Sequence, residues 1–229
     1  MACATALAGA ALPVAALTPA EVYALVAPSV WRVQTYDVDG LPLGLGSAVV
    51  VDHEALATNC HVLARAKKVV VRHEKVGVEA RLEMWDTARD VCRLHAPGLG
   101  APAVRLAPTA GVAVGSNVYA IGTPRGLELT MSAGLVSSLR RNASGQVVLV
   151  QTSASISRGS SGGGLFDEKG ALIGLTTLAI TGDAQNLNFA IPADWIAELP
   201  ERHARLNKNT AAPATGDQAS AATASAPKR

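Results

Sequence analysis

The sequence has few of the residues that build metal centres or disulfide-rich folds. It contains three Cys without a CxxC pair and five His that stand as single residues. These spacings argue against a structural zinc site and against a small domain built on disulfides, and they imply no metal or cofactor. The chain also lacks an excess of charge, because twenty Lys and Arg face eighteen Asp and Glu, for a net charge of +2. A nucleic-acid-binding scaffold and a disordered activator are therefore not expected.

The two ends of the chain differ in composition from its centre. Residues 1–16 carry no charged side chain and end in small residues, as a secretory signal does, although the usual basic start is missing. A membrane anchor and a flexible, untargeted start are the alternatives, and the many Ala make a poor anchor. Residues 208–229 contain eight Ala and no larger apolar side chain, which predicts a disordered tail. We therefore expect an exported protein, periplasmic or secreted, with one folded domain at 17–207.

The centre of the chain predicts many short strands and two helices. Thr18, Pro19 and Glu21 form a capping box that opens a short helix through about Ala27, and a second helix is expected at 193–206. Short β-branched runs separated by Gly, Pro and Asp predict strands at 30–36, 47–51, 55–58, 68–73, 78–83, 91–95, 104–106, 117–122, 127–139, 147–151, 163–166, 171–178 and 186–191.

A Pro-rich stretch at 96–108 divides these strands into two series. The strands do not alternate with helices, so the pattern favours an all-β fold over a parallel sheet. We expect two six-stranded antiparallel barrels, one at about 30–106 and the other at about 115–192. Their facing sides would form a cleft.

Ser161 lies in the segment that is most informative about chemistry, because four of the six residues 159–164 are Gly. A nucleophilic Ser needs a base and backbone N–H groups directed at the oxyanion that forms when it attacks a carbonyl. Glycines around it allow the tight turn in which the N–H groups of Gly159 and Ser161 enter one pocket. A Gly/Ser-rich hairpin turn is the alternative. The segment also matches the nucleophile elbow of α/β-hydrolases, but there the acid and the His follow the Ser, whereas here only His203 does.

His61 and Asp90 are the candidate base and acid. His61 follows a predicted strand and has small neighbours, and Asp90 begins another predicted strand. A carboxylate in that place could hold an imidazole in the tautomer that a base requires. Each residue alone is more often structural, but the order His61, Asp90, Ser161, with two members in one barrel and one in the other, favours a catalytic set.

At this point the sequence resembles the trypsin-like serine peptidases, in particular the HtrA/Deg branch, from about Pro28 to Ile196. The segments that carry the resemblance are LGSAVV (45–50), TNCHV (58–62), DVC (90–92), IGTPRGL (121–127), QTSA (151–154), RGSSGGGL (158–165), LIGLTT (172–177) and NFAIP (188–192). The resemblance implies that His61 is the general base, Asp90 its orienting carboxylate and Ser161 the acyl-forming nucleophile. Gly159 and Ser161 would supply the oxyanion hole, and polypeptides would be the substrates.

The resemblance also implies a specificity pocket, and the positions of two cysteines in an exported protein predict a disulfide. Ser155, six residues before the nucleophile, would lie at the pocket floor, where a neutral group cannot compensate a bound Lys or Arg. With Ile156, Thr176, Thr177 and Leu178 as walls, we expect cleavage after small or medium apolar residues. If His61 and Asp90 touch, Cys60 and Cys92 are close enough for a bond, and two buried free thiols are the alternative.

The sequence departs from this family in three places. Nothing after Ile196 is long enough to supply the PDZ domain that HtrA-type enzymes usually carry, so we expect a peptidase domain without one. The loop at 37–44 is short. Ser160 and Gly164 stand where the family often has Asn and Pro or Ala. A non-catalytic module that binds extended peptides in the same cleft, and a Ser esterase on the same scaffold, are the alternative functions.

Overall fold

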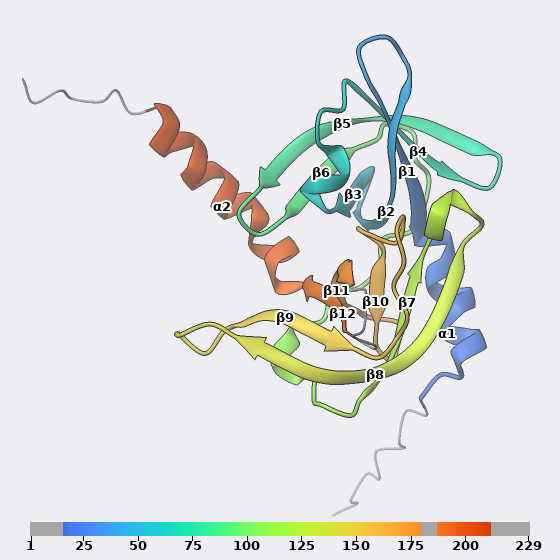
Figure 1. Ribbon diagram of the computed structural model, residues 1–229, viewed down its shortest axis with the longest axis vertical. Helices are drawn as coiled ribbons and strands as arrows, with labels where there is room; N and C mark the ends of the chain where they lie inside the picture. Colours follow the sequence, from blue (N-terminus) through green and yellow to red (C-terminus); the bar gives the residue numbers. More distant parts are fainter. Residues whose placement is uncertain (1–15, 180–186, 212–229) are drawn as a thin grey trace, which may run out of the picture.

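The computed structural model describes residues 16–179 and 187–211 and shows two barrels with a helix at each end of the chain (Figure 1). The predicted export segment lies outside the described residues except for Ala16, and the predicted tail lies outside them beyond residue 211. Each barrel closes from six antiparallel strands, which confirms the predicted fold class. Neither helix in the described ranges has the length and apolar content needed to cross a membrane.

Barrel one uses the first six strands in the spatial order β1-β2-β3-β6-β5-β4. Its strands are β1 (Val30–Tyr36), β2 (Pro42–Asp52), β3 (Ala55–Thr58), β4 (Lys68–His73), β5 (Val76–Asp86) and β6 (Val91–His95). Barrel two has the order β10-β11-β12-β9-β8-β7. Its strands are β7 (Asn117–Gly122), β8 (Thr130–Arg141), β9 (Val147–Thr152), β10 (Gly164–Phe166), β11 (Leu172–Ala179) and β12 (Asn188–Pro192).

Each barrel interior is filled by aliphatic side chains from alternate strand positions. Along β1, Trp31, Val33 and Thr35 are buried while the residues between them are half-buried, which is the period of two that a barrel strand requires. A third cluster joins the two barrels to both helices, and Phe166 at its centre is fully buried. Packing between the barrels therefore fixes the position of the cleft.

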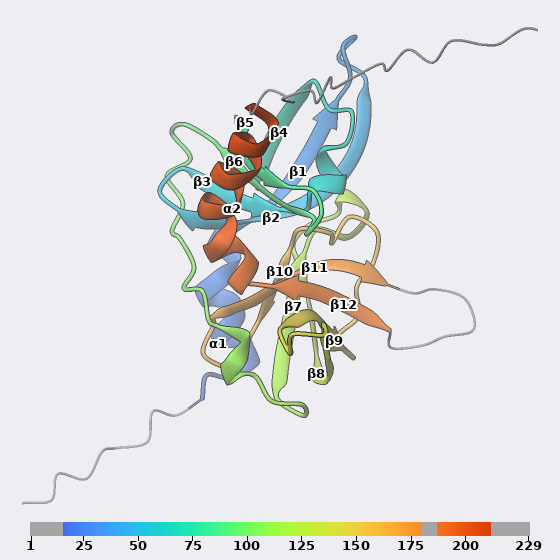
Figure 2. The same cartoon turned by 90° about the vertical axis from the view of Figure 1, so that its left-hand side faces the viewer.

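Helix α1 (Pro19–Val26) lies beside barrel two and helix α2 (Asp194–Ala211) beside barrel one (Figure 2). Helix α1 begins at the predicted capping box, in which Glu21 Oε2 accepts from the Thr18 N–H at 2.8 Å and Thr18 Oγ1 accepts from the Glu21 N–H at 3.3 Å. Hydrogen bonds from the backbone and side chain of Thr18 lower the pKa of Glu21. Helix α2 leaves barrel two and lies against β5 of barrel one.

Several predicted boundaries differ from the structure. No strand forms at 104–106, where Leu106 makes only an isolated bridge to Leu172. This segment hydrogen-bonds instead to both barrels, from the Val104 N–H to the Val50 carbonyl and from the Leu172 N–H to the Arg105 carbonyl, so barrel one ends at His95. Strand β2 begins five residues before the predicted start at 47, and α2 continues to Ala211, four residues into the predicted tail. Four short 3-10 turns complete the fold, at Ala27–Ser29, Cys60–Leu63, Thr109–Gly111 and Pro124–Gly126.

Candidate active site

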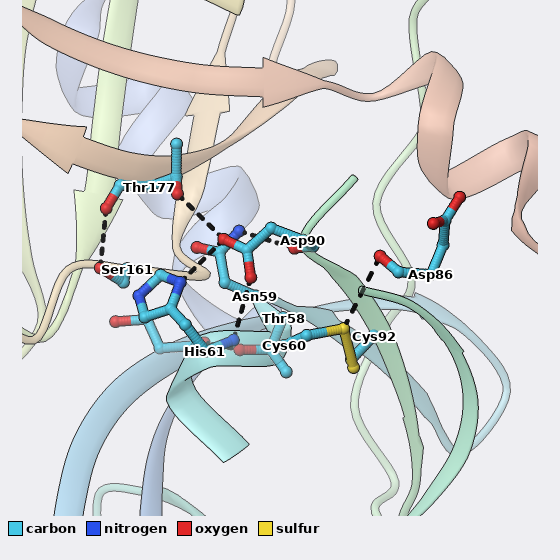
Figure 3. Close-up of polar contacts among 10 residues, drawn as sticks. Thr58, Asn59, Cys60, His61, Asp86, Asp90, Cys92, Ser161 and Thr177 are labelled. Atoms are coloured by element: carbon cyan, nitrogen blue, oxygen red, sulfur yellow. Dashed lines mark hydrogen bonds and ion pairs between the residues drawn. A yellow bond between two sulfur atoms is a disulfide. The ribbon is translucent and has the colours of Figure 1, made fainter. Parts of the chain in front are cut away.

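Asp90 holds both the backbone and the ring of His61. The 3-10 turn Cys60–Leu63 follows β3 and turns the His61 side chain, which is 51% exposed, into the cleft. The His61 N–H donates to Asp90 Oδ1 at 2.9 Å, and His61 Nδ1 lies 2.7 Å from Asp90 Oδ2 (Figure 3). A carboxylate that binds both groups leaves the imidazole little freedom to turn, and it favours the tautomer with the proton on Nδ1.

A disulfide joins the segments that carry these two residues. Cys60 precedes His61, Cys92 is two residues beyond Asp90, and their Cα atoms are 5.0 Å apart. The bond connects the turn after β3 to β6. Strands β3 and β6 also pair with each other, with Thr58 opposite Cys92. The disulfide therefore ties the segments that carry His61 and Asp90 to each other on barrel one.

Ser161 meets this pair from the other barrel. In Figure 3 the imidazole of His61 is drawn between the Asp90 carboxylate and the Ser161 side chain. The Ser161 hydroxyl donates to the carbonyl of Thr177 at 2.9 Å. Among the described residues, no hydrogen bond joins this hydroxyl to His61, and catalytic hydrogen bonds are often incomplete before substrate binds. The cleft thus brings together the three residues that the sequence singled out.

Thr177 contacts both sides of this arrangement. Its carbonyl accepts from Ser161, and its hydroxyl donates to Asp90 Oδ2 at 3.2 Å (Figure 3). The pairing of β11 with β12 shifts register between Thr176 and Leu178, so Thr177 lies in a β-bulge, a feature that redirects side chains near active sites. The sequence placed Thr177 in the wall of the substrate pocket, because a bulge leaves no clear signal in a run of β-branched residues.

The Arg158 carbonyl points toward Arg125. It accepts from the Arg125 N–H at 2.7 Å. No peptide bond among the described residues is cis, and in a trans peptide the C=O and N–H point in opposite directions. The Gly159 N–H, which belongs to the same peptide as this carbonyl, therefore points away from Arg125. Gly159 has φ +94°, and a Cβ there would lie 2.7 Å from the Arg125 nitrogen, so this backbone requires glycine.

The peptide bond between Ser160 and Ser161 is also held through its carbonyl group. The Ser160 carbonyl accepts from Thr176 Oγ1 at 2.6 Å and from the Gly163 N–H at 2.8 Å, so the Ser161 N–H points opposite to these partners. Within the described part of the chain, neither the Gly159 nor the Ser161 N–H has a protein partner. Backbone N–H groups without a protein partner are available to bind an oxyanion.

Ser47 of β2 fastens this loop to barrel one. Its N–H donates to the Ser161 carbonyl at 2.8 Å and its hydroxyl to the Gly159 carbonyl at 2.9 Å. The Ser47 carbonyl accepts from Thr58 Oγ1 at 2.7 Å, and a Cβ on Gly162 would lie only 2.1 Å from that carbonyl oxygen. The sequence predicts no role for Ser47, because its partners in this loop, Gly159 and Ser161, are more than a hundred residues away.

A cavity of about 120 Å³ lies beside the loop. Its lining contains Ser155 and Thr176, two of the five residues predicted for the substrate pocket, and no charged side chain. Ile156 is instead 8% exposed and packs in the core of barrel two. Its neighbours Ser155 and Ser157 are exposed, so the side chains along this loop alternate between outward and inward positions. Thr177 binds Asp90, and Leu178 lies in β11 with its side chain outside the described part. The remaining lining residues are Ala120, Ile121, Gly122, Pro124, Thr130, Ser132, Ser157 and Ser160.

Comparison with known proteins agrees with this geometry. The trypsin-like peptidase domain family matches residues 46–175. A chloroplastic protease, Protease Do-like 1 of Arabidopsis thaliana, is 34% identical over 77% of this chain and 43% of its own length. A probable periplasmic serine endoprotease DegP-like of Ectopseudomonas mendocina is 36% identical over 69% of this chain and 35% of its own length. This chain thus spans less than half the length of these two relatives.

Solved structures give the same result. An HtrA-type protease, AlgW with a tripeptide, has 32% identity and a TM-score of 0.72, over 80% of this chain and 62% of that structure. Because the family match covers more than half of the chain, this chain belongs to the trypsin-like peptidase domain family, and it is similar to proteases of the Do, DegP and HtrA type.

Proposed function

We propose that this protein is a serine endopeptidase that cleaves polypeptides through an acyl-enzyme. The observation that carries the proposal is the pair of hydrogen bonds from His61 to Asp90, at 2.9 and 2.7 Å, directly beside Ser161. One of the relatives is named as a probable serine endoprotease, and this similarity supports the same activity.

In the proposed mechanism, His61 takes the proton of the Ser161 hydroxyl on its second ring nitrogen while the oxygen attacks the substrate carbonyl. The negative charge on the carbonyl oxygen is stabilised by the Gly159 and Ser161 N–H groups. Asp90 stays ionised and stabilises the imidazolium. His61 then gives the proton to the leaving amine, so the C–N bond breaks, and a water molecule hydrolyses the ester with the same His61 as base.

The proposed substrates carry a small or medium apolar residue before the cut bond. The cavity beside Ser155 offers hydroxyls and apolar groups but no carboxylate. A buried Lys or Arg without a counter-charge is costly, so basic side chains are disfavoured there. Mass mapping of the fragments of an unfolded protein tests this preference, and a predominance of cuts after Lys or Arg would contradict it.

We further propose that the protein is exported to the periplasm or secreted, with residues 1–16 as its signal. One relative is named as periplasmic, and a disulfide between Cys60 and Cys92 is typical of an oxidising compartment.

Labelling by a fluorophosphonate probe tests the catalytic assignment. We expect labelling of the wild type and none of Ser161→Ala, because only an activated Ser attacks the probe. Ser144→Ala, in the exposed turn between β8 and β9, is the matched control and should label like the wild type. A folded wild type that remains unlabelled would favour a non-catalytic peptide-binding module. Turnover of small esters without cleavage of casein would instead favour an esterase.

A further inference from the structure

A groove borders the Ser161 loop and shares no lining residue with the cavity beside Ser155. Its volume is about 500 Å³. Barrel one contributes Gln34 of β1 and the start of β2, and barrel two contributes Arg125, Arg158 and Gly159. Because Gly159 is one of the two proposed oxyanion donors, the groove begins at the reacting centre.

The groove is positively charged and has an apolar floor. Arg125 and Arg158 are the only charged side chains in its lining, which holds no carboxylate. No ion pair in the described ranges involves either arginine. Leu43 and Leu45 also line the groove and are 40% and 42% exposed. The groove lining therefore combines exposed aliphatic side chains with two arginines that form no ion pair within the described residues.

The backbone that carries these arginines is firmly held. Arg125 has φ +53°, in the left-handed region that non-glycine residues seldom adopt. Its N–H donates to the Arg158 carbonyl at 2.7 Å, and Arg32 of β1 donates to the carbonyl of Gly126 at 2.9 Å. Such unfavourable conformations persist where the surroundings over-determine them, and they cluster at ligand-binding sites. The two cationic residues are thus anchored to each other and to barrel one.

We infer that this groove binds an acidic side chain in one of the first three residues after the cut bond. The inference rests on the proposed function. The residue before the cut bond is proposed to occupy the cavity lined by Ser155 and Thr176. The residues after the cut bond would then continue past Gly159 into the groove. Three extended residues span about 10 Å, which allows one of them to reach the arginines. A guanidinium pairs well with a carboxylate, and the methylenes of a Glu would lie on Leu43 and Leu45.

Quenched fluorescent peptides that differ at one of these three positions test the inference. At the responsive position we expect kcat/KM to be about fivefold higher for Glu than for Gln, or about 1 kcal/mol, with the ratio falling as salt is added. In the double variant Arg125→Gln, Arg158→Gln the ratio should fall to about one. In Arg125→Glu, Arg158→Glu the preference should shift to Lys. Arg81→Gln, an exposed position on β5, is the control and should keep the wild-type ratio.

A binding measurement separates failure of the inference from failure of the proposed function. Ser161→Ala should bind the Glu peptide more tightly than the Gln peptide in fluorescence anisotropy, and the two Arg→Gln changes should remove the difference. Equal cleavage and equal binding of Glu and Gln peptides at all three positions would overturn the inference while the peptidase assignment stands. If the wild type cleaves no peptide and resists the probe, the peptidase assignment fails, and an acid preference in binding would still support the groove.

Discussion

Arg202 on α2 compensates a buried carboxylate, and its removal should destabilise the fold strongly. Asp86, at the end of β5, is 1% exposed. Arg202 Nε lies 2.5 Å from Asp86 Oδ2, whereas the nearest nitrogen of Arg89 is 3.9 Å away, and Asp86 Oδ1 has no partner. Breaking a buried ion pair by removing one partner costs about 3 to 5 kcal/mol. Because Arg89 remains nearby, we expect Arg202→Met to lower the free energy of unfolding by about 3 kcal/mol.

Urea titration and thermal melting measure this effect. For a chain of this size, a loss of about 3 kcal/mol lowers Tm by about 6 to 12 °C. The double variant Asp86→Asn, Arg202→Met should regain at least half of the loss, because it no longer buries an unpaired charge. Arg205→Met, an exposed position on the same helix, should change stability by less than about 0.5 kcal/mol. A cost below about 1 kcal/mol for Arg202→Met, with no recovery in the double variant, would refute the reasoning.

Three further changes test the site and its support. Thr177→Val removes the hydroxyl that binds Asp90 and should lower kcat/KM about tenfold, whereas Thr177→Ser should retain most activity; equal loss in both would contradict a role for the hydroxyl. Gly162→Ala should abolish folding or probe labelling, because its Cβ would lie 2.1 Å from a backbone oxygen, whereas Gly145→Ala, at φ +80° in open space, should cost about 1 kcal/mol. Replacing Cys60 and Cys92 by Ala should lower the unfolding free energy by about 3 to 4 kcal/mol in urea, and an unchanged midpoint would refute a stabilising bond.

Much of the fold could be predicted because the barrel strands are short, β-branched and bounded by Gly or Pro. The capping box at Thr18 marks the first helix for a local reason, since all its contacts lie within three residues. The segment 104–106 differs from its prediction because its apolar residues are partly buried and its backbone makes single hydrogen bonds to each barrel, and a local pattern cannot distinguish such a linker from a strand. The early start of β2 depends on pairing with β1 through Leu45, Gly44 and Pro42, which local composition does not reveal.

The candidate site was predictable where chemistry requires a rare residue type in a definite order, as for His61, Asp90 and Ser161. The supporting residues were not, because their roles depend on contacts across the cleft. Ser47 looks like an ordinary strand serine, yet it holds two carbonyls of the opposite barrel. Ile156 was predicted in the pocket as the neighbour of Ser155, whereas its side chain packs in the core of barrel two.

In the proposed mechanism, one hydrogen bond of Ser161 must change before the reaction. Asp90 holds the His61 ring. Ser47 holds two carbonyls of the loop that carries Ser161. The proposed base and the proposed nucleophile are therefore each held in position. The remaining step is to exchange the hydrogen bond to the Thr177 carbonyl for one to His61. A hydrogen bond between neutral groups is worth about 1 kcal/mol net, so this exchange lowers the rate by no more than about tenfold. A substrate strand that approached β11 and engaged the Thr177 carbonyl would remove even that penalty, because the hydroxyl would then lose its competing acceptor.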